Sequence, residues 1–111
     1  MAERNAHAAE AVSPEATLVL YEDDQLSIVQ ATPPDTVLLK GDIDITNSAA
    51  LADALAQVTA RWGQVSVDTA ELRFIDVSGW RVLLASPARP RPRLLNVAPC
   101  VRRLSDRMMS L

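Results

Sequence analysis

The sequence predicts an α/β domain, a small mixed β-sheet with helices packed on it in the order β-β-α-β-α-β-α. Three observations lead to this fold class. Short apolar segments bounded by turn residues recur along the chain, as β-strands do. The stretch 48–62 instead repeats its apolar residues at helical spacing. The first two strands follow each other through a turn, whereas the later ones alternate with helices, so the sheet should mix antiparallel and parallel pairs.

The domain is expected to begin after an N-terminal tail. Residues 1–16 are rich in Ala and Glu and show no apolar period, which predicts a flexible tail or linker ahead of a single domain over 17–111. Thr17–Tyr21 is β-prone and either adds a strand or docks the end of the linker. Leu26–Gln30 and Val37–Leu39 are strand-like, and the proline-containing turn between them predicts a hairpin.

The first helix is the clearest single element. Its apolar stripe consists of Leu51, Leu55, Val58 and Trp62. Asn47 or Ser48 can cap its start, and Gly63 is well placed as the residue just after its end.

The second half alternates strands and helices. In order, we expect a short strand over 65–68, a further brief apolar contact with the sheet at 74–75, a short helix over 78–85, a basic connector over 88–93, a strand over 94–97 and a last helix that opens at Pro99.

Composition excludes several classes of protein. Among the 111 residues there is one cysteine, Cys100, and one histidine, His7, too few for the familiar zinc sites or for a histidine-dependent triad. The three glycines, Gly41, Gly63 and Gly79, lie too far apart for a phosphate-binding loop. We therefore expect a protein that is not an enzyme and holds no cofactor. The sequence has no apolar run of roughly 18 residues, so we expect no insertion into a membrane.

Charge is distributed unevenly along the chain. Residues 1–60 hold two basic and ten acidic side chains, whereas residues 61–111 hold nine arginines and four acids. The overall net charge of −3 argues against direct binding of nucleic acid. The basic half therefore needs another explanation.

The most informative segment runs from Phe74 to Trp80. An apolar strand end leads through Asp76 and Val77 into Ser78 and Gly79, and then into a helix. This order places the Ser78 hydroxyl at a helix N-terminus, where free N–H groups and the helix dipole tolerate added negative charge. Gly79 lacks the side chain that would crowd the approach of another molecule.

Two motifs together resemble a known family. Leu39-Lys40-Gly41-Asp42-Ile43-Asp44 with Asn47, followed by Phe74-Ile75-Asp76-Val77-Ser78-Gly79, is similar to a STAS domain, over about residues 25–109. The family name covers sulphate transporters and anti-sigma factor antagonists. Its bacterial antagonists bind a serine kinase that is also an anti-sigma factor and so release the sigma factor. The kinase phosphorylates the loop serine, the modified antagonist dissociates, and a phosphatase reverses the reaction.

The resemblance implies roles for individual residues. Ser78 would be the phosphoacceptor, and Val77 stands where many members have a second hydroxyl. The implied partner-binding residues are Asp44, Thr46, Asn47, Asp76, Gly79, Trp80 and Arg81. The implied partners are a serine-kinase anti-sigma factor and a phosphatase. We expect a cytoplasmic protein that is a monomer or a weak dimer.

Other interpretations of the same residues stay open. Ser78 can be no more than a helix N-cap, since serine is a preferred cap. Trp80, where members usually carry an aliphatic residue, can belong to the core or to a partner surface. A different class of function is a STAS subunit that docks on a membrane lipid-transport ATPase without being phosphorylated, and a third is a module of a larger sensor protein.

Overall fold

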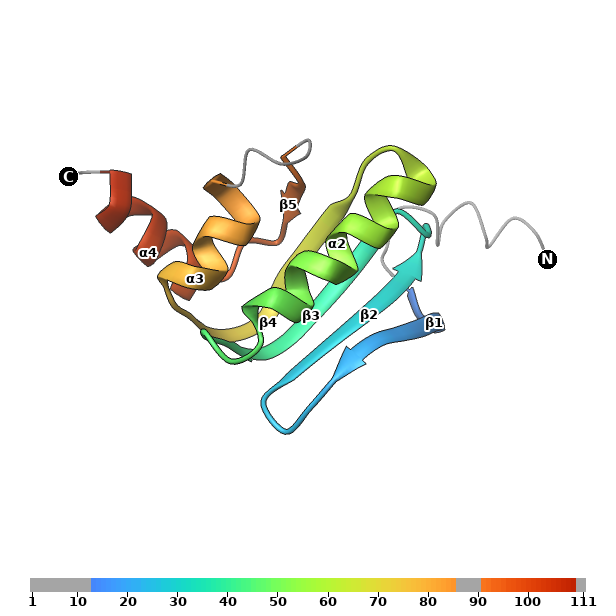
Figure 1. Ribbon diagram of the computed structural model, residues 1–111, viewed down its shortest axis with the longest axis horizontal. Helices are drawn as coiled ribbons and strands as arrows, with labels where there is room; N and C mark the ends of the chain where they lie inside the picture. The colour runs from blue at the N-terminus through green and yellow to red at the C-terminus, as the bar shows by residue number, and fades with distance from the viewer. Residues whose placement is uncertain (1–12, 86–90, 110–111) are drawn as a thin grey trace.

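The structure, a computed structural model, describes the backbone of residues 13–85 and 91–109 and the side chains of residues 18–84 and 91–109. Its elements, labelled as in Figure 1, are β1 (Ser13–Glu22), β2 (Leu26–Thr32), β3 (Thr36–Ile43), α2 (Ser48–Trp62), β4 (Ser66–Ile75), α3 (Val77–Trp80), the π-helical turn η1 (Arg81–Ala85), β5 (Arg93–Leu95) and α4 (Pro99–Met109). The predicted α/β class is confirmed, and the observed order is β-β-β-α-β-α-β-α.

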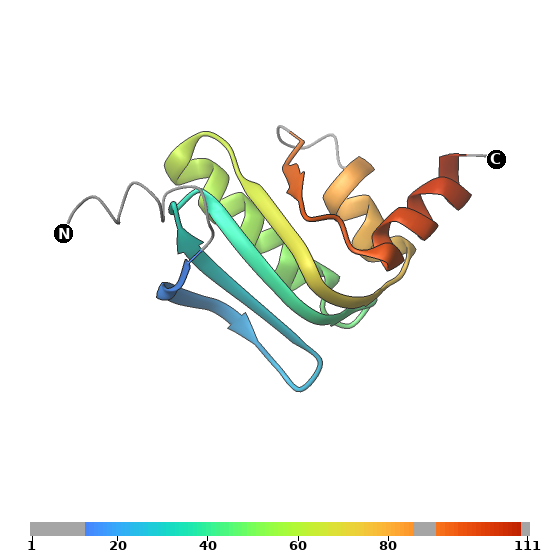
Figure 2. The same ribbon diagram turned by 180° about the vertical axis from the view of Figure 1, so that it is seen from behind.

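The five strands form one mixed sheet in the order β1-β2-β3-β4-β5. β1, β2 and β3 pair antiparallel, whereas β3 pairs parallel with β4 and β4 pairs parallel with β5. The helix α2 lies across one face of the sheet, and α3 and α4 lie together beside β4 (Figure 1). The view from behind shows strands in front of α2, so this helix leaves the other face of the sheet uncovered (Figure 2).

The core lies between the sheet and α2. The strands contribute their inward residues, among them Ile28, Leu39 and Val67, and α2 contributes Leu51 and Leu55, all of them fully buried. This is the alternation expected when one face of a sheet packs and the other meets solvent. Burial of these side chains supplies the main driving force for the fold.

The helix α2 begins and ends where the sequence predicts. Gly63, which follows it, has φ +82° and donates its N–H to the carbonyl of Thr59 at 2.7 Å, so the expected C-terminal role of this glycine is confirmed. Trp62 was expected to extend the apolar stripe, but its side chain is 46% exposed. It is the last residue of the helix, and it borders a shallow groove beside Leu18 and Arg61.

Two strands are longer than the sequence predicts. The segment 17–21 belongs to β1, which begins at Ser13, within the region expected to be a tail; residues 1–12 of that tail lie outside the described residues. The predicted strand 65–68 and the contact at 74–75 are parts of the single strand β4. The polar residues Ser66, Asp68 and Thr69 are buried in it, and β5 and the segment after it hydrogen-bond to all three. Beyond them Leu72 and Ile75 are again buried, so the strand continues where the apolar run stops.

The C-terminal third differs from the prediction in detail. The expected helix 78–85 is α3 followed by η1, and the expected strand 94–97 is β5, which ends at Leu95. Asn96 then takes a positive φ of 49°, which asparagine tolerates better than most residues. Within the described residues, no helix is long and apolar enough to cross a membrane. Residues 86–90, which include part of the predicted basic connector, lie outside the described residues.

Candidate functional site

The two loops that the sequence singles out meet at one end of the sheet. The strands β3 and β4 are parallel, and Ile43 and Ile75 pair near their carboxyl ends. The backbone N–H of Asp76 donates to the carbonyl of Ile43 at 3.1 Å, which joins the segment after β4 to the segment after β3. The sequence segments around Asp44 and Ser78 are therefore neighbours in space.

Asp76 caps the helix that carries Ser78. Its backbone is extended, and one carboxylate oxygen, Oδ1, accepts hydrogen bonds from the Gly79 N–H at 3.1 Å and from the Ser78 hydroxyl at 2.5 Å. Ser78 is thus the second residue of α3 and not its cap, which corrects the interpretation of this serine as an N-cap. Its side chain is half-buried.

This hydrogen bond sets the orientation of the serine. A hydroxyl has one proton and two lone pairs, and the proton of Ser78 is directed at Asp76. The lone pairs of Oγ then remain free to attack an incoming electrophile. Among the described residues, no group of three or more His, Cys, Asp or Glu side chains is placed to hold a metal ion.

Gly79 is a packing residue. A Cβ at this position would lie 2.6 Å from Cγ2 of Ile43 and 2.9 Å from Cγ1 of Ile75, and Gly79 is buried. The missing side chain therefore lets α3 pack closely onto the ends of β3 and β4. The expectation that Gly79 makes room for another molecule is wrong, because the room is filled by the protein's own core.

Asp44 organises the loop between β3 and α2. Its Oδ1 accepts from the N–H of Thr46 at 2.9 Å and from the Thr46 hydroxyl at 2.5 Å, and its Oδ2 accepts from Nε2 of Gln25 at 3.2 Å. These bonds, those of Thr46 foremost, hold the pKa of the Asp44 carboxyl below its ordinary value. Thr46 itself is exposed.

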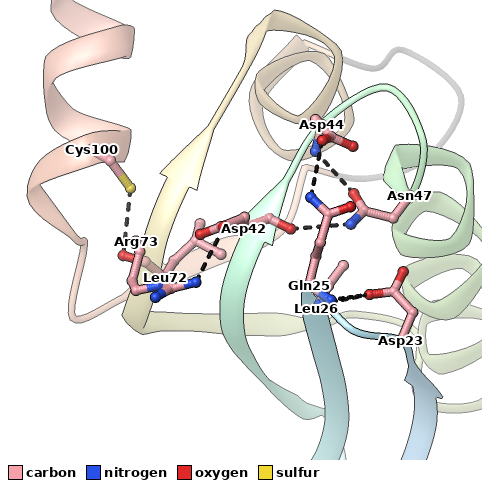
Figure 3. A network of polar contacts seen from close by, with 9 residues as sticks. All are labelled: Asp23, Gln25, Leu26, Asp42, Asp44, Asn47, Leu72, Arg73 and Cys100. Atoms are coloured by element: carbon pink, nitrogen blue, oxygen red, sulfur yellow. Dashed lines mark hydrogen bonds and ion pairs between the residues drawn. The ribbon is translucent and has the colours of Figure 1, made fainter.

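Asn47 acts inside the same loop. Its side chain is 1% exposed, accepts from the N–H of Asp44 at 2.9 Å and donates to the carbonyl of Asp42 at 3.1 Å (Figure 3). It stands at the N-cap position of α2 without making a side-chain cap. A direct contact between Asn47 and a partner is therefore ruled out in this conformation, and the residue positions Asp44 instead.

The structure adds a third segment that sequence reasoning missed. In the turn between β1 and β2, Oδ1 of Asp23 accepts from the backbone N–H groups of Gln25 and Leu26, both at 2.7 Å. The Gln25 side chain then reaches Asp44 (Figure 3). The backbone carbonyl of Gln25 accepts from the N–H of Asp42 at 2.9 Å. An Asp-Asp pair after a β-prone run is a turn signal, and it would have located this turn.

Trp80 and Arg81 follow Ser78 at the helix. Trp80 is half-buried, and its indole Nε1 is buried without a hydrogen-bond partner in the described part of the chain. Arg81 is exposed, and its backbone N–H donates to the carbonyls of Val77 and Ser78. Arg81 therefore lies on the surface one helical turn after the serine, whereas the Trp80 side chain is partly buried in the protein.

The fold and these loops define a small α/β domain that presents a serine-bearing helix start at the carboxyl end of a mixed sheet. A family model described as "Mlab, STAS domain" matches residues 27–110, and the chain belongs to this family. The structure is similar to the crystal structure of an anti-sigma factor antagonist from Mycobacterium paratuberculosis, at 22% sequence identity and a TM-score of 0.56, over 88% of this chain and 82% of that chain. At that identity the likeness shows the fold. No curated protein matched the sequence.

Proposed function

We propose that the domain is an antagonist of an anti-sigma factor, that its partner is a serine kinase, and that phosphorylation of Ser78 releases the complex. The observation that carries the proposal is the hydrogen bond from the Ser78 hydroxyl to Asp76 at 2.5 Å. It holds a half-buried serine in one rotamer beside a carboxylate, at the end of the sheet where three loops meet. Membership of the STAS family and the likeness to an anti-sigma factor antagonist support this proposal.

Phosphorylation removes the donor of this hydrogen bond. The Ser78 Oγ forms a bond to the γ-phosphorus of ATP, ADP leaves, and the hydroxyl proton passes to a base of the kinase or to water. The product places about −1.5 to −2 charges beside the Asp76 carboxylate. Because Ser78 Oγ lies 2.5 Å from Asp76 Oδ1, the phosphate would start within about 4 Å of this carboxylate, where the repulsion is about 1–4 kcal/mol for each unit of charge. The phosphate therefore turns away from Asp76, towards the surface that a partner would cover.

The fold should survive this change. Asp76 keeps its bond to the Gly79 N–H, so α3 remains capped. The N-terminal dipole of a helix returns roughly 0.3–1 kcal/mol to a nearby negative charge, which offsets part of the repulsion. The switch then acts at the interface, since a hydrated phosphate cannot be buried in a close contact without losing its water.

The proposal is tested by intact-mass analysis after incubation with ATP and the anti-sigma kinases of the source organism. Wild type should gain one phosphate, Ser78→Ala none, and Thr46→Ala, which removes the exposed hydroxyl of the neighbouring loop, one phosphate as in wild type. Equal modification of wild type and Ser78→Ala would remove Ser78 from the mechanism. In a pull-down, Ser78→Asp should retain less kinase than wild type, and equal retention would contradict release at the interface.

A second function is favoured by one feature of the site. The Ser78 hydroxyl is half-buried and already bonded, and Val77 leaves no second hydroxyl in the loop. A serine used only in this structural way fits a STAS subunit that docks unmodified on a membrane lipid-transport ATPase. Absence of phosphate on wild type, together with copurification of such an ATPase, would select this function over the first.

A further inference from the structure

Two large apolar side chains are exposed at the site end of the sheet. Ile45, in the loop after β3, is 74% exposed, and Phe74, at the end of β4, is 50% exposed. Phe74 is the register partner of Asp42, and Ile45 lies two residues beyond Ile43, so both belong to the carboxyl ends of neighbouring parallel strands. Because the buried centre of a protein interface is mainly apolar, these two side chains are the groups at this end that a partner would gain most by covering.

The loop holds Ile45 in place. Asp44 and Thr46 flank Ile45, and the Asp44 carboxylate accepts from the Thr46 N–H. The N–H of Asp44 in turn donates to the side-chain oxygen of Asn47. The carbonyl of Asp44 also accepts from the N–H groups of Asn47 at 3.1 Å and Ser48 at 2.9 Å. Because the backbone around Ile45 is already ordered, a partner that covers this side chain loses little entropy in ordering the loop.

Acidic side chains lie in the loop of Ile45 and in the β1–β2 turn that is tied to it. Asp44 has a lowered pKa and is therefore negative at neutral pH. Asp23 and Asp24 are exposed in the β1–β2 turn, and Gln25 ties that turn to Asp44. The nearby Asp42 differs, because Arg73 pairs with its carboxylate at 3.2 Å. Asp23, Asp24 and Asp44, called the acidic rim below, thus outnumber the one exposed arginine that the described residues place beside Ser78, Arg81. Charge complementarity therefore calls for basic groups on a partner.

We infer that Ile45 and Phe74 are apolar anchors for the partner, and that the partner covers them with an apolar pocket bordered by basic side chains. This inference rests on the proposed function, in which the occupant is the serine-kinase anti-sigma factor. The β1–β2 turn supplies part of the acidic rim. Anchors of this kind carry most of the binding free energy, while rim charges mainly set the association rate.

The inference also explains how a negative modification can release a basic partner. Rim charges attract over several ångströms and are screened by salt, so one added phosphate strengthens them only modestly. Seating the partner on the apolar anchors, by contrast, requires close contact at the loops beside Ser78. A phosphate there must lose its hydration to be enclosed, and this local cost opposes the contact.

The experiment measures the affinity of the full chain for the kinase that phosphorylates wild type in the mass assay. Ile45→Ala and Phe74→Ala are compared with Met109→Ala and Trp62→Ala, whose side chains are 75% and 46% exposed and lie away from this end. Each anchor variant should raise the dissociation constant about 30-fold, the effect of a hot-spot residue. The two controls should stay within about twofold, as surface residues outside the contact do.

A charge variant tests the rim. Asp24→Lys should lower the association rate about tenfold and flatten its salt dependence, whereas Asp53→Lys, on the exposed side of α2, should change neither. Thermal melts of each variant confirm folding. If the kinase modifies Ser78 and binds wild type but binds the anchor variants equally well, the inference is refuted and the proposed function stands. If no kinase binds or modifies wild type, the proposed function fails and the inference fails with it.

Discussion

Gly41 offers the sharpest test of how the site is built. This glycine has φ +113°, and a Cβ there would lie 2.0 Å from the backbone oxygen of Gln25. That carbonyl accepts the N–H of Asp42, so relief of the clash by moving it breaks a hydrogen bond worth about 1 kcal/mol. Gly63 also has a positive φ, of +82°, but a Cβ there would meet nothing within 4 Å. The two glycines share backbone strain and differ in the clash.

We therefore expect different losses for Gly41→Ala and Gly63→Ala. Backbone strain alone costs about 1–2 kcal/mol in either variant. The displaced backbone adds overpacking of about 1–3 kcal/mol at Gly41, which together with the lost hydrogen bond brings its total to about 3–6 kcal/mol. Because native stability is about 5–15 kcal/mol, Gly41→Ala should lose a large part of it.

Urea unfolding followed by circular dichroism measures both variants against wild type. The midpoint for Gly41→Ala should fall well below that for Gly63→Ala, at a similar slope. Equal midpoints for the two variants would refute the reasoning, since they would show that the contact between Gly41 and Gln25 yields freely. The same result would weaken the argument that the β1–β2 turn is fixed to the loop of Asp44.

Three further outcomes follow from the site. Asp76→Ala should cost about 1 kcal/mol in urea unfolding, whereas Asp76→Asn, which keeps a side-chain acceptor, should cost less; equal losses would contradict the capping role. The folded state lowers the pKa of Asp44, so its contribution to stability is present above the ordinary pKa of the carboxyl group and is lost as pH falls through the lower folded pKa. The free energy of unfolding of wild type should thus exceed that of Asp44→Asn by more at pH 6 than at pH 2, as parallel unfolding series at the two pH values would show. The same difference in free energy at both pH values would exclude this linkage. Burial raises the pKa of the Cys100 thiol, so at pH 8 iodoacetamide should modify it more slowly in the native state than in urea, and equal rates would contradict its burial.

The parts of the fold that the sequence predicts well are those with local causes. The stripe on α2 repeats at helical spacing, and Gly63 ends the helix through its own backbone geometry. Both signals lie within a few residues of the feature they determine. The full length of β4 is different, because its polar residues Ser66, Asp68 and Thr69 can be buried only where β5 and the segment after it hydrogen-bond to them. That condition depends on the packing of other elements and cannot be read from the strand itself.

The candidate site divides in the same way. The proximity of the Asp44 and Ser78 segments follows from two strands that run parallel, which alternation of strands and helices predicts. The roles of Asn47 and Gly79 do not follow, because each depends on which neighbour fills the adjacent space. Gln25 was missed since its link to Asp44 joins residues 19 positions apart. Local sequence thus locates the site, and tertiary contacts decide which residues support it and which are exposed.

The uneven charge of the chain now bears on how the proposed switch works. Acids from the first half of the sequence gather at the site end, in the β1–β2 turn and around Asp44. Part of the second half's positive charge is brought to them, where Arg73 pairs with Asp42 at 3.2 Å. On a surface that is already acidic, one more negative charge changes the attraction for a basic partner only slightly, and salt screens this change. The partner therefore distinguishes phosphorylated from unmodified Ser78 mainly through the cost of dehydrating the phosphate in the close contact beside Ile45, and less through long-range attraction or repulsion of charges. The ratio of the partner's affinities for the unmodified and the phosphorylated protein should thus change little between low and high salt.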